Sequence, residues 1–150
     1  MRQNIDGFHT DAGSKNLIEI HGSFRGINCT NCAYQTNVEN YSGFELLPKC
    51  PECNSLLKPT VVLFNESLPL DAVERYHEIL RKGFDVVFSI GTSSQFPYIA
   101  EPFIQHYRIG YTTIEINPDI TDLSRYATYH LQMSAGDALT KIWQELTKEP

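Results

Sequence analysis

Four cysteines in two closely spaced pairs constrain this chain more than any other feature of its sequence. Cys29 and Cys32 form the first pair, and Cys50 and Cys53 form the second, giving the pattern C-x2-C-x17-C-x2-C. This spacing is typical of structural zinc sites, because each two-residue gap lets one tight turn aim two thiolates at the same ion. We therefore predict a zinc-binding module over residues 29–58.

Two other interpretations of the cysteines stay open on these grounds: a pair of disulfides, or four unrelated thiols. Disulfides are typical of secreted chains, and the first residues of this sequence contain no apolar core of a signal peptide. We therefore favour zinc and expect a cytoplasmic location. With four protein ligands, the zinc would have no open position for a substrate, so it would be structural.

The charge balance argues against two classes of partner. The chain has 150 residues, with 12 Lys and Arg against 18 Asp and Glu, and its formal net charge is -6. Binding to nucleic acid or to an anionic membrane depends on a basic patch, and the sequence has no run of Lys or Arg, so we expect neither partner. No stretch approaches the roughly 18 consecutive apolar residues of a transmembrane helix.

Outside the cysteine module, predicted strands alternate with predicted helices. The strands cover residues 17–20, 60–64, 84–90, 111–116 and 129–133, and the helices cover residues 70–81, 98–107 and a segment that follows Ser134. The apolar run over 84–90 predicts a buried strand, and Ser134 with Asp137 resembles a capping box. This alternation indicates an α/β fold in which helices cover a parallel sheet.

Parallel sheets bind ligands at the carboxyl ends of their strands. Gly91, Thr92 and Ser93 follow one predicted strand, and Asn117 to Asp119 follow the next. Glycine lets the backbone approach a ligand closely, while hydroxyls and amides offer hydrogen bonds to ribose or phosphate. The chain contains neither a GxGxxG motif nor a Walker lysine motif, so these loops alone do not identify the ligand.

Several short motifs follow one another along the chain. They are Gln3-Asn4-Ile5-Asp6-Gly7-Phe8-His9, Ala12-Gly13-Ser14, Ile18-Glu19-Ile20-His21-Gly22, the two cysteine pairs, the segment from Lys58 to Pro69, Gly91-Thr92-Ser93 and Ile116-Asn117-Pro118. In this order they resemble the sirtuins, which are NAD-dependent protein-lysine deacylases. The resemblance implies an incomplete sirtuin catalytic domain over residues 1–150. Residues 1–28 and 59–150 would form a partial Rossmann-like parallel sheet flanked by helices, with the zinc module inserted.

The resemblance also implies a role for each matching position. His21 matches the catalytic histidine, a general base on a ribose hydroxyl after the acyl-lysine carbonyl oxygen has attacked the ribose carbon that bears nicotinamide. The positions matched to NAD binding are Gln3, Asn4, Ile5, Asp6, Gly91, Thr92, Ser93, Asn117, Pro118, Asp119 and Ala138. Val62, Phe64 and Glu66 match the strand that pairs with the substrate peptide, and Cys29, Cys32, Cys50 and Cys53 match the zinc ligands. NAD would be the cosubstrate, acylated protein lysines the partners, and nicotinamide, lysine and an acyl-ADP-ribose ester the products.

The chain departs from the sirtuin pattern at two places. Asn65 stands where the family usually has glycine, although asparagine tolerates unusual backbone angles better than most residues. The chain also opens at the motif that begins with Gln3, so the glycine-rich loop that cradles the NAD pyrophosphate in the family has no counterpart here. We therefore expect an exposed sheet edge, which a partner chain or self-association would cover.

The second departure leaves two further functions open. One alternative is a catalytically silent zinc-ribbon and half-Rossmann module that binds acyl-lysine peptides or a partner protein. Another is NAD-dependent ADP-ribosyl transfer, which related enzymes perform. We expect deacylation to be the parent activity and the 150-residue chain alone to be weak or inactive.

Overall fold

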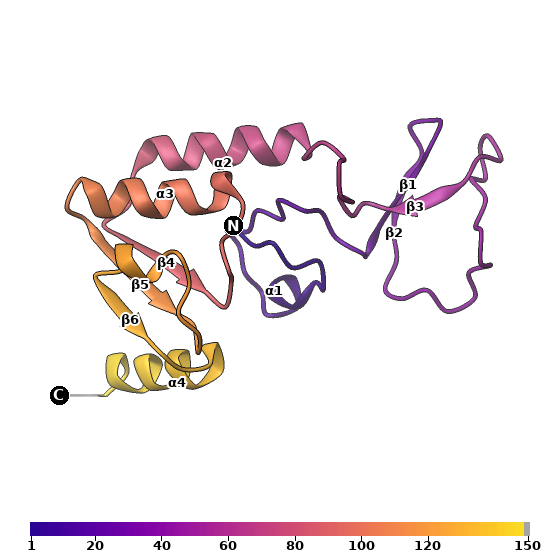
Figure 1. The fold of residues 1–150 in the computed structure, drawn as a ribbon. Helices are drawn as coiled ribbons and strands as arrows, with labels where there is room; N and C mark the ends of the chain where they lie inside the picture. The colour runs from indigo at the N-terminus through magenta and orange to yellow at the C-terminus, as the bar shows by residue number, and fades with distance from the viewer. Residues whose placement is uncertain (149–150) are drawn as a thin grey trace. The chain divides into compact units, whose positions relative to one another are not determined.

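The computed structural model describes residues 1–148, which fall into two compact units (Figure 1). The first unit runs from Met1 to Arg81, and the second begins at Lys82. In chain order, the first unit contains helix α1 (Phe8–Asp11), strands β1 (Gly26–Cys29), β2 (Gln35–Asn37) and β3 (Leu57–Pro59), and all but the last residue of helix α2 (Leu70–Lys82). The helix predicted over residues 70–81 is therefore confirmed.

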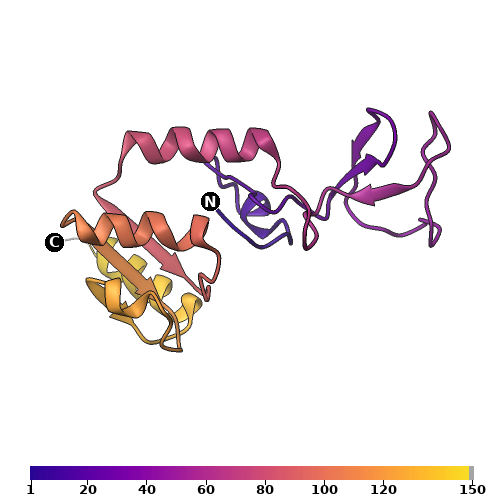
Figure 2. The same ribbon diagram turned by 45° about the horizontal axis from the view of Figure 1, so that its top comes forward.

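The strands of the first unit form a small antiparallel sheet in the order β2-β1-β3 (Figure 2). Ile27 in β1 is paired with Thr36 on one side and with Pro59 on the other. The Ile27 side chain is 1% exposed and that of Ile20 is fully buried, so both belong to the apolar core of this unit. Cys29 is the last residue of β1, which places the first cysteine pair at the end of the sheet.

Residues 17–20 do not form the predicted strand. They contribute one isolated parallel bridge, between Arg2 and Glu19. The Arg2 N–H donates to the Ile18 carbonyl (2.8 Å), and the Ile20 N–H donates to the Arg2 carbonyl (3.3 Å). The prediction is wrong here because the chain turns at Ile20, so the apolar run has no partner along the rest of its length.

Residues 60–64 are not a strand either. β3 ends at Pro59, whose ring nitrogen has no hydrogen to donate to a ladder. Beyond it, the Val62 N–H donates to the His21 carbonyl (3.0 Å), and the chain then turns at Asn65, whose φ is +70°. The β-branched composition of this segment favours a strand, but the turn and the lack of a continuous ladder decide against it.

The second unit is a parallel α/β layer. It contains strands β4 (Val86–Ile90), β5 (Thr112–Ile116) and β6 (Tyr129–Leu131), helices α3 (Pro97–Arg108) and α4 (Ala135–Leu146), and the short 3-10 helix η1 (Ser124–Tyr126). The strands are all parallel and lie in the order β4-β5-β6. Helices α3 and α4 lie on opposite faces of this sheet (Figure 1 and Figure 2). The predicted parallel sheet flanked by helices is therefore confirmed.

The burial of β4 differs from the prediction. Ser89 is buried, but Val86, Phe88 and Ile90 are 40%, 46% and 38% exposed. β4 is an edge strand that pairs with β5 alone among the residues described. A continuous apolar run is typical of a strand covered on both faces, and here it overstates the burial of the strand.

Helix α4 begins with the cap that the sequence predicts. The Ser134 Oγ accepts the N–H of Asp137 (3.2 Å) and donates to the carboxylate of the same residue (2.7 Å). These bonds satisfy one of the N–H groups that the first turn of a helix leaves without a partner. Among residues 1–148, no helix has both the length and the apolar character needed to cross a bilayer.

Candidate functional site

The four cysteines converge on one point in the first unit. Their Sγ atoms all lie within 4.8 Å of one another. The sulfurs of Cys29 and Cys53 are 3.4 Å apart, and those of Cys32 and Cys50 are 3.6 Å apart, and none of the four forms a disulfide. A tetrahedral zinc with Zn–S bonds of about 2.3 Å would hold its sulfurs about 3.8 Å apart. The cluster therefore fits a structural zinc site and favours it over the alternatives of disulfides and unrelated thiols.

Hydrogen-bond donors point at two of the four sulfurs and favour their thiolate form. The N–H groups of Asn31 and Cys32 point at the Cys29 Sγ at 3.3 and 3.4 Å. Ser55, through its side chain and its backbone N–H, lowers the pKa of the Cys53 thiol to about 6. At Cys32, the Tyr34 backbone hydrogen bond lowers the pKa of the thiol, but burial and the neighbouring cysteine sulfurs outweigh it and raise this pKa to about 12. Because the thiolate is the form that binds metal, the donors at Cys29 and Cys53 favour zinc binding.

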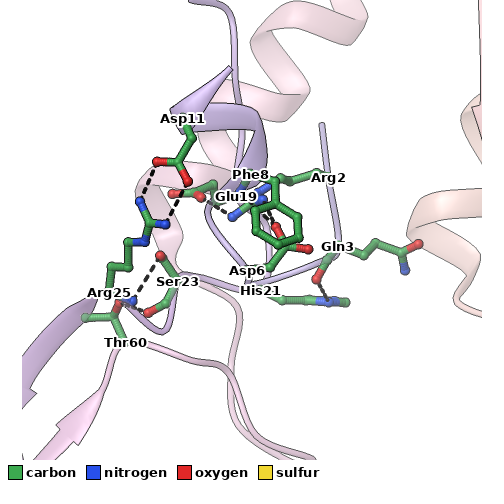
Figure 3. A network of polar contacts seen from close by, with 10 residues as sticks. All are labelled: Arg2, Gln3, Asp6, Phe8, Asp11, Glu19, His21, Ser23, Arg25 and Thr60. Carbon is green, nitrogen blue, oxygen red and sulfur yellow. Dashed lines mark hydrogen bonds and ion pairs between the residues drawn. The ribbon is translucent and has the colours of Figure 1, made fainter. Parts of the chain in front are cut away.

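His21, the predicted catalytic histidine, is half-buried, and a backbone carbonyl orients its ring (Figure 3). Its Nδ1 lies 3.2 Å from the carbonyl oxygen of Gln3. A carbonyl oxygen only accepts hydrogen bonds, so this contact requires the hydrogen on Nδ1 and places the lone pair of the neutral ring on Nε2. This is the tautomer that a general base acting through Nε2 requires.

Two glycines outside the predicted set hold the His21 segment against the chain that follows β3. Gly22 has φ +74°, and a Cβ built on it would lie 1.8 Å from the Thr60 carbonyl oxygen. A Cβ on Gly26 would lie 2.3 Å from the Thr60 Oγ1. With both glycines in place, the Val62 N–H reaches the His21 carbonyl. The glycines are visible in the sequence, but the close approach that requires them is a property of the fold.

Arg2 is also outside the predicted set, yet it links two predicted segments (Figure 3). Its side chain is 4% exposed, and its guanidinium lies 2.7 Å from the Asp6 carboxylate and 2.5 Å from that of Glu19. Gln3 follows Arg2 in the chain, and His21 follows Glu19 by two positions. Arg2 thereby fastens the segment that orients the histidine to the segment that carries it. No sequence pattern indicates which carboxylates converge on this arginine.

The other predicted residues of the Gln3 motif have different environments. Asn4 is exposed, and Ile5 is half-buried. The Asp6 carboxylate accepts the N–H of Phe8 (3.0 Å) as well as the bond from Arg2. The Phe8 amide and the Arg2 guanidinium lower the pKa of Asp6, so this side chain is an anion at neutral pH.

A second ion pair stands beside the first (Figure 3). The guanidinium of Arg25 donates to both carboxylate oxygens of Asp11, at 2.6 and 2.7 Å. It lies against Gly7, where a Cβ would approach Arg25 to 2.9 Å. The Arg25 hydrogen bond lowers the pKa of Asp11. This pair connects helix α1 to the start of β1.

The three residues predicted to contact the substrate peptide differ in their burial and in their hydrogen bonds. Val62 is half-buried, and the Phe64 side chain is 92% exposed. The Glu66 carboxylate accepts two bonds from the Lys58 Nζ (2.5 and 2.7 Å) and one from the Leu63 N–H (3.0 Å), and Lys58 lowers the pKa of Glu66. Glu66 therefore fastens the turn after residue 63 to β3.

The second unit has a polar cavity of about 580 Å³. Five of the predicted NAD-binding residues line it, namely Gly91, Thr92, Ser93, Asn117 and Asp119. The Asn117 side-chain amide donates to the Thr92 carbonyl (3.1 Å), and the Asn117 Oδ1 accepts the Asp119 N–H (3.1 Å). The loops that follow β4 and β5 are thereby joined, as expected for the carboxyl ends of neighbouring parallel strands. Pro118 is exposed and is not part of this lining.

The composition of this cavity fits the nucleotide part of NAD. Its volume lies within the range of roughly 300–1,000 Å³ that is typical of small-molecule sites. Gly91 has φ +59°, and no atom lies within 4 Å of where its Cβ would be, so its backbone is open to a ligand. The hydroxyls of Thr92 and Ser93 can donate to phosphate oxygens, and the Asp119 carboxylate can accept the hydroxyls of a ribose.

The structure does not bring Ala138 into this cavity. Ala138 is 1% exposed and lies in α4. It lines a separate apolar groove of about 350 Å³, together with Leu131, Met133 and Ile142 among others. The predicted residues thus lie in separate places. The first unit contains the Gln3 motif with His21, the cysteine cluster, and the segment with Val62, Phe64 and Glu66. The second unit contains the polar cavity and, apart from it, Ala138 in the apolar groove.

The second unit is a parallel α/β layer with a polar cavity at its strand ends. In the same chain, the first unit contains a four-cysteine module that fits a metal. The chain is therefore an α/β protein with a metal-binding module. The chain belongs to the Sir2 family, because the sequence model of that family matches residues 1–97. The predicted resemblance to the sirtuins is therefore confirmed.

Three known proteins illustrate the relationship. NAD-dependent protein deacylase 2 of Pseudomonas aeruginosa is 41% identical over 145 residues, which cover 95% of this chain and 57% of that protein. The crystal structure of a Sir2 homolog–NAD complex is 38% identical with a TM-score of 0.88, over 96% of this chain and 56% of the other. A Sir2 structure with a bound propionylated peptide is 29% identical with a TM-score of 0.84, over 95% and 61%. This chain therefore spans less than two thirds of the length of these proteins.

Proposed function

We propose that this chain carries the catalytic histidine, the structural zinc and part of the nucleotide site of an NAD-dependent protein-lysine deacylase. The observation that carries the proposal is the hydrogen bond between the His21 Nδ1 and the Gln3 carbonyl, which sets the tautomer of a general base. The 41% identity to a protein named as an NAD-dependent deacylase supports the same reaction class.

NAD, when bound, supplies a ribose carbon that loses nicotinamide readily. The residues that would hold its nucleotide part are those that line the polar cavity, chiefly Thr92, Ser93 and Asn117. In the proposed reaction, His21 removes a proton from a ribose hydroxyl through Nε2. Its Nδ1–H continues to donate a hydrogen bond to the Gln3 carbonyl oxygen. That carbonyl also stabilises the imidazolium that forms, because it receives the Nδ1–H in both protonation states.

The substrate would be an acylated lysine in a protein. A solved Sir2 structure contains a propionylated peptide, and it is similar to 95% of this chain. Val62 and the exposed ring of Phe64 supply apolar surface next to the segment that bonds His21. An extended peptide held mainly by its backbone would explain a tolerance for different sequences around the lysine.

A reducing compartment, such as the cytoplasm, suits this function. The zinc module needs all four cysteines as thiolates, and none of them is in a disulfide. We therefore propose that the protein works inside the cell. Fractionation of the source cells, with the protein recovered in the soluble cytosolic fraction, would test this location.

The experiment for the activity is the release of nicotinamide from NAD by the purified full chain, with and without an acetyl-lysine peptide. The test variant is His21→Ala. The control is His9→Ala, which alters an exposed histidine in the same unit. We expect weak peptide-dependent release, because the chain lacks a counterpart of the family's pyrophosphate loop. His21→Ala should lower this release by at least about 10²-fold, and His9→Ala should leave it unchanged.

Three results would contradict this function for the chain. Equal release of nicotinamide by His21→Ala and His9→Ala would show that His21 does not act in the reaction. Binding of the acyl peptide by a folded, zinc-loaded chain without any release of nicotinamide would instead support the catalytically silent binding module. Transfer of ADP-ribose to protein, detected by mass spectrometry, would support NAD-dependent ADP-ribosyl transfer.

A further inference from the structure

Glu115, in strand β5, is a fully buried carboxylate that the proposed reaction does not use. It is 0% exposed, and it alternates along β5 with Ile114 and Ile116. Such alternation ordinarily predicts a strand with one face in water. Here the polar face is covered instead, because Thr113, on the same side as Glu115, donates through its Oγ1 to the Tyr126 carbonyl (2.7 Å) at the end of η1.

Two hydroxyl groups donate to the Glu115 carboxylate, one from the loop that follows β5 and one from the first residue of η1. The Thr121 Oγ1 donates to one oxygen, and the Ser124 Oγ donates to the other at 2.6 Å. Each hydroxyl in turn accepts a backbone N–H of the same loop: Ser124 accepts from Thr121 (2.9 Å), and Thr121 accepts from Leu123 (3.1 Å). The carboxylate therefore fixes the rotamers of both hydroxyls, and these hydroxyls fix the backbone of the loop.

His130, in β6, completes this network. Its Nε2 lies 3.6 Å from the Glu115 carboxylate and 3.3 Å from the Asn117 carbonyl oxygen. The side chain of Asn117 belongs to the polar cavity, where it bonds the Thr92 carbonyl. Glu115 and His130 thus contact two residues that line the cavity. His130 contacts the Asn117 carbonyl, and Glu115 accepts a hydrogen bond from Thr121.

We propose that Glu115 is a positioning residue for the nucleotide site: it holds the loop 117–124 in the shape that receives the nucleotide part of NAD. Of the nine residues that line the cavity, Asn117, Asp119, Ile120, Thr121 and Asp122 lie on this loop. Glu115 itself is buried beneath them and does not line the cavity. The inference rests on the proposed function for the identity of the ligand, and on the contacts above for the role of the carboxylate.

The first test needs no ligand and follows hydrogen exchange of the backbone amides in the full chain. The test variants are Glu115→Gln, which keeps the shape but leaves a single acceptor oxygen, and Glu115→Met, which leaves none. The control is Glu101→Gln, an exposed carboxylate of α3 in the same unit. We expect the amides of residues 119–124 to exchange about tenfold faster in Glu115→Gln, faster again in Glu115→Met, and unchanged in the control.

The second test measures binding of ADP-ribose to the same proteins by calorimetry. We expect about tenfold weaker binding by Glu115→Gln, at a Tm that stays close to that of the wild type, and unchanged binding by Glu101→Gln. The single variants Thr121→Val and Ser124→Ala should each weaken binding. Combined with Glu115→Met, neither should weaken it much further, because the acceptor is already absent.

The outcomes separate this inference from the proposed function. Loop exchange that Glu115→Met leaves unchanged would overturn the positioning role, whatever the protein binds. Equal ADP-ribose affinity in wild type and Glu115→Met would overturn it as well. A wild-type chain that binds no ADP-ribose would overturn the inference as stated, because the loop would then have no nucleotide to receive. The proposed function would still be tested separately, by the nicotinamide-release assay with His21→Ala.

Discussion

The carbonyl oxygen of Thr60 occupies the space next to Gly22 so closely that a Cβ on that glycine would lie 1.8 Å from it. Gly22 also has φ +74°, a backbone conformation that only glycine adopts without strain. Because Gly22 follows His21 directly, this contact sets where the proposed catalytic base stands relative to the segment that follows β3.

Replacement of Gly22 by alanine should therefore destabilise the protein strongly. The steric conflict is with backbone, which cannot move aside, and the left-handed φ adds about 1–2 kcal/mol of strain. We expect the free energy of unfolding in urea to fall by about 3 kcal/mol or more. The matched control is Gly13→Ala, at φ +75° with no atom within 4 Å of the new Cβ, which should show the backbone strain alone. Equal losses in the two variants would contradict the role of Thr60.

Asn65 adopts φ +70°, which accounts for the sirtuin preference for glycine at this position. Asparagine enters the left-handed region more readily than other residues with a side chain. We expect Asn65→Gly to change the free energy of unfolding by less than about 1 kcal/mol and Asn65→Val to lower it by about 1–2 kcal/mol or more. Thermal unfolding of the three proteins would measure this, and a valine variant as stable as the wild type would count against a left-handed turn here.

The ion cluster around Arg2 should respond asymmetrically to the loss of its members. The Arg2 side chain is 4% exposed, whereas those of Asp6 and Glu19 are 35% and 30% exposed. Without the arginine, both carboxylates can recover water, but without the carboxylates, the guanidinium is a buried charge that lacks a counter-ion. We expect the double variant Asp6→Asn with Glu19→Gln to lower Tm more than Arg2→Met does. The reverse order, measured by calorimetry, would show that Arg2 is not the buried partner.

Removal of zinc should unfold the cysteine module and spare the second unit. Metal analysis should find one zinc per chain, and a chelator or Cys50→Ser should abolish hydrogen-exchange protection in β1, β2 and β3. The strands β4, β5 and β6 belong to the other compact unit, so their protection should persist. A protein that keeps the sheet of the first unit intact after losing its metal would show that the cysteines are not structural ligands.

Acid should weaken the first unit through carboxylates whose pKa values are lowered in the folded state. Those of Asp6, Asp11 and Glu66 are lowered by the Phe8 amide, by Arg25 and by Lys58 respectively. A lowered folded-state pKa contributes stability that is fully present above the unfolded-state value of about 4 and is lost as pH falls through the folded-state value. We expect the stability of this unit to decline below about pH 4.

The variant Asp11→Asn provides the check on this pH dependence. It removes one of the three groups, so its stability should fall less steeply with acid than that of the wild type, and high salt should narrow the difference because the pair is solvent-exposed. Parallel acid titrations of the two proteins, followed by circular dichroism, are sufficient. Identical slopes at low salt would rule out the Arg25 pair as a source of the pH dependence.

Local patterns were sufficient to predict much of the fold. Each of these patterns depends on residues that are close together in the chain. The cysteine spacing requires only two tight turns, the capping residues of α4 lie three positions apart, and the apolar periodicity that predicts α3 lies within one short segment. The short motifs and their order along the chain, the one that contains His21 among them, placed the protein among the sirtuins. The strands over residues 17–20 and 60–64 could not be judged in this way, because their apolar residues have no continuous partner in the folded chain.

The sequence by itself determined the family, a cysteine spacing that fits a zinc site, and the alternation of strands and helices, since these depend on residue types at fixed short spacings. Only the tertiary structure decided that Gly22 must lie against Thr60, that Arg2 bridges Asp6 and Glu19, and that Glu115 is covered by its own loop. The contacts of Gly22 with Thr60 and of Arg2 with Glu19 join residues far apart in the chain. The burial of Glu115 covers a face of β5 that the alternating sequence pattern predicts to be exposed to water. The free energy of such contacts depends on burial and distance, which exist only once the chain has folded.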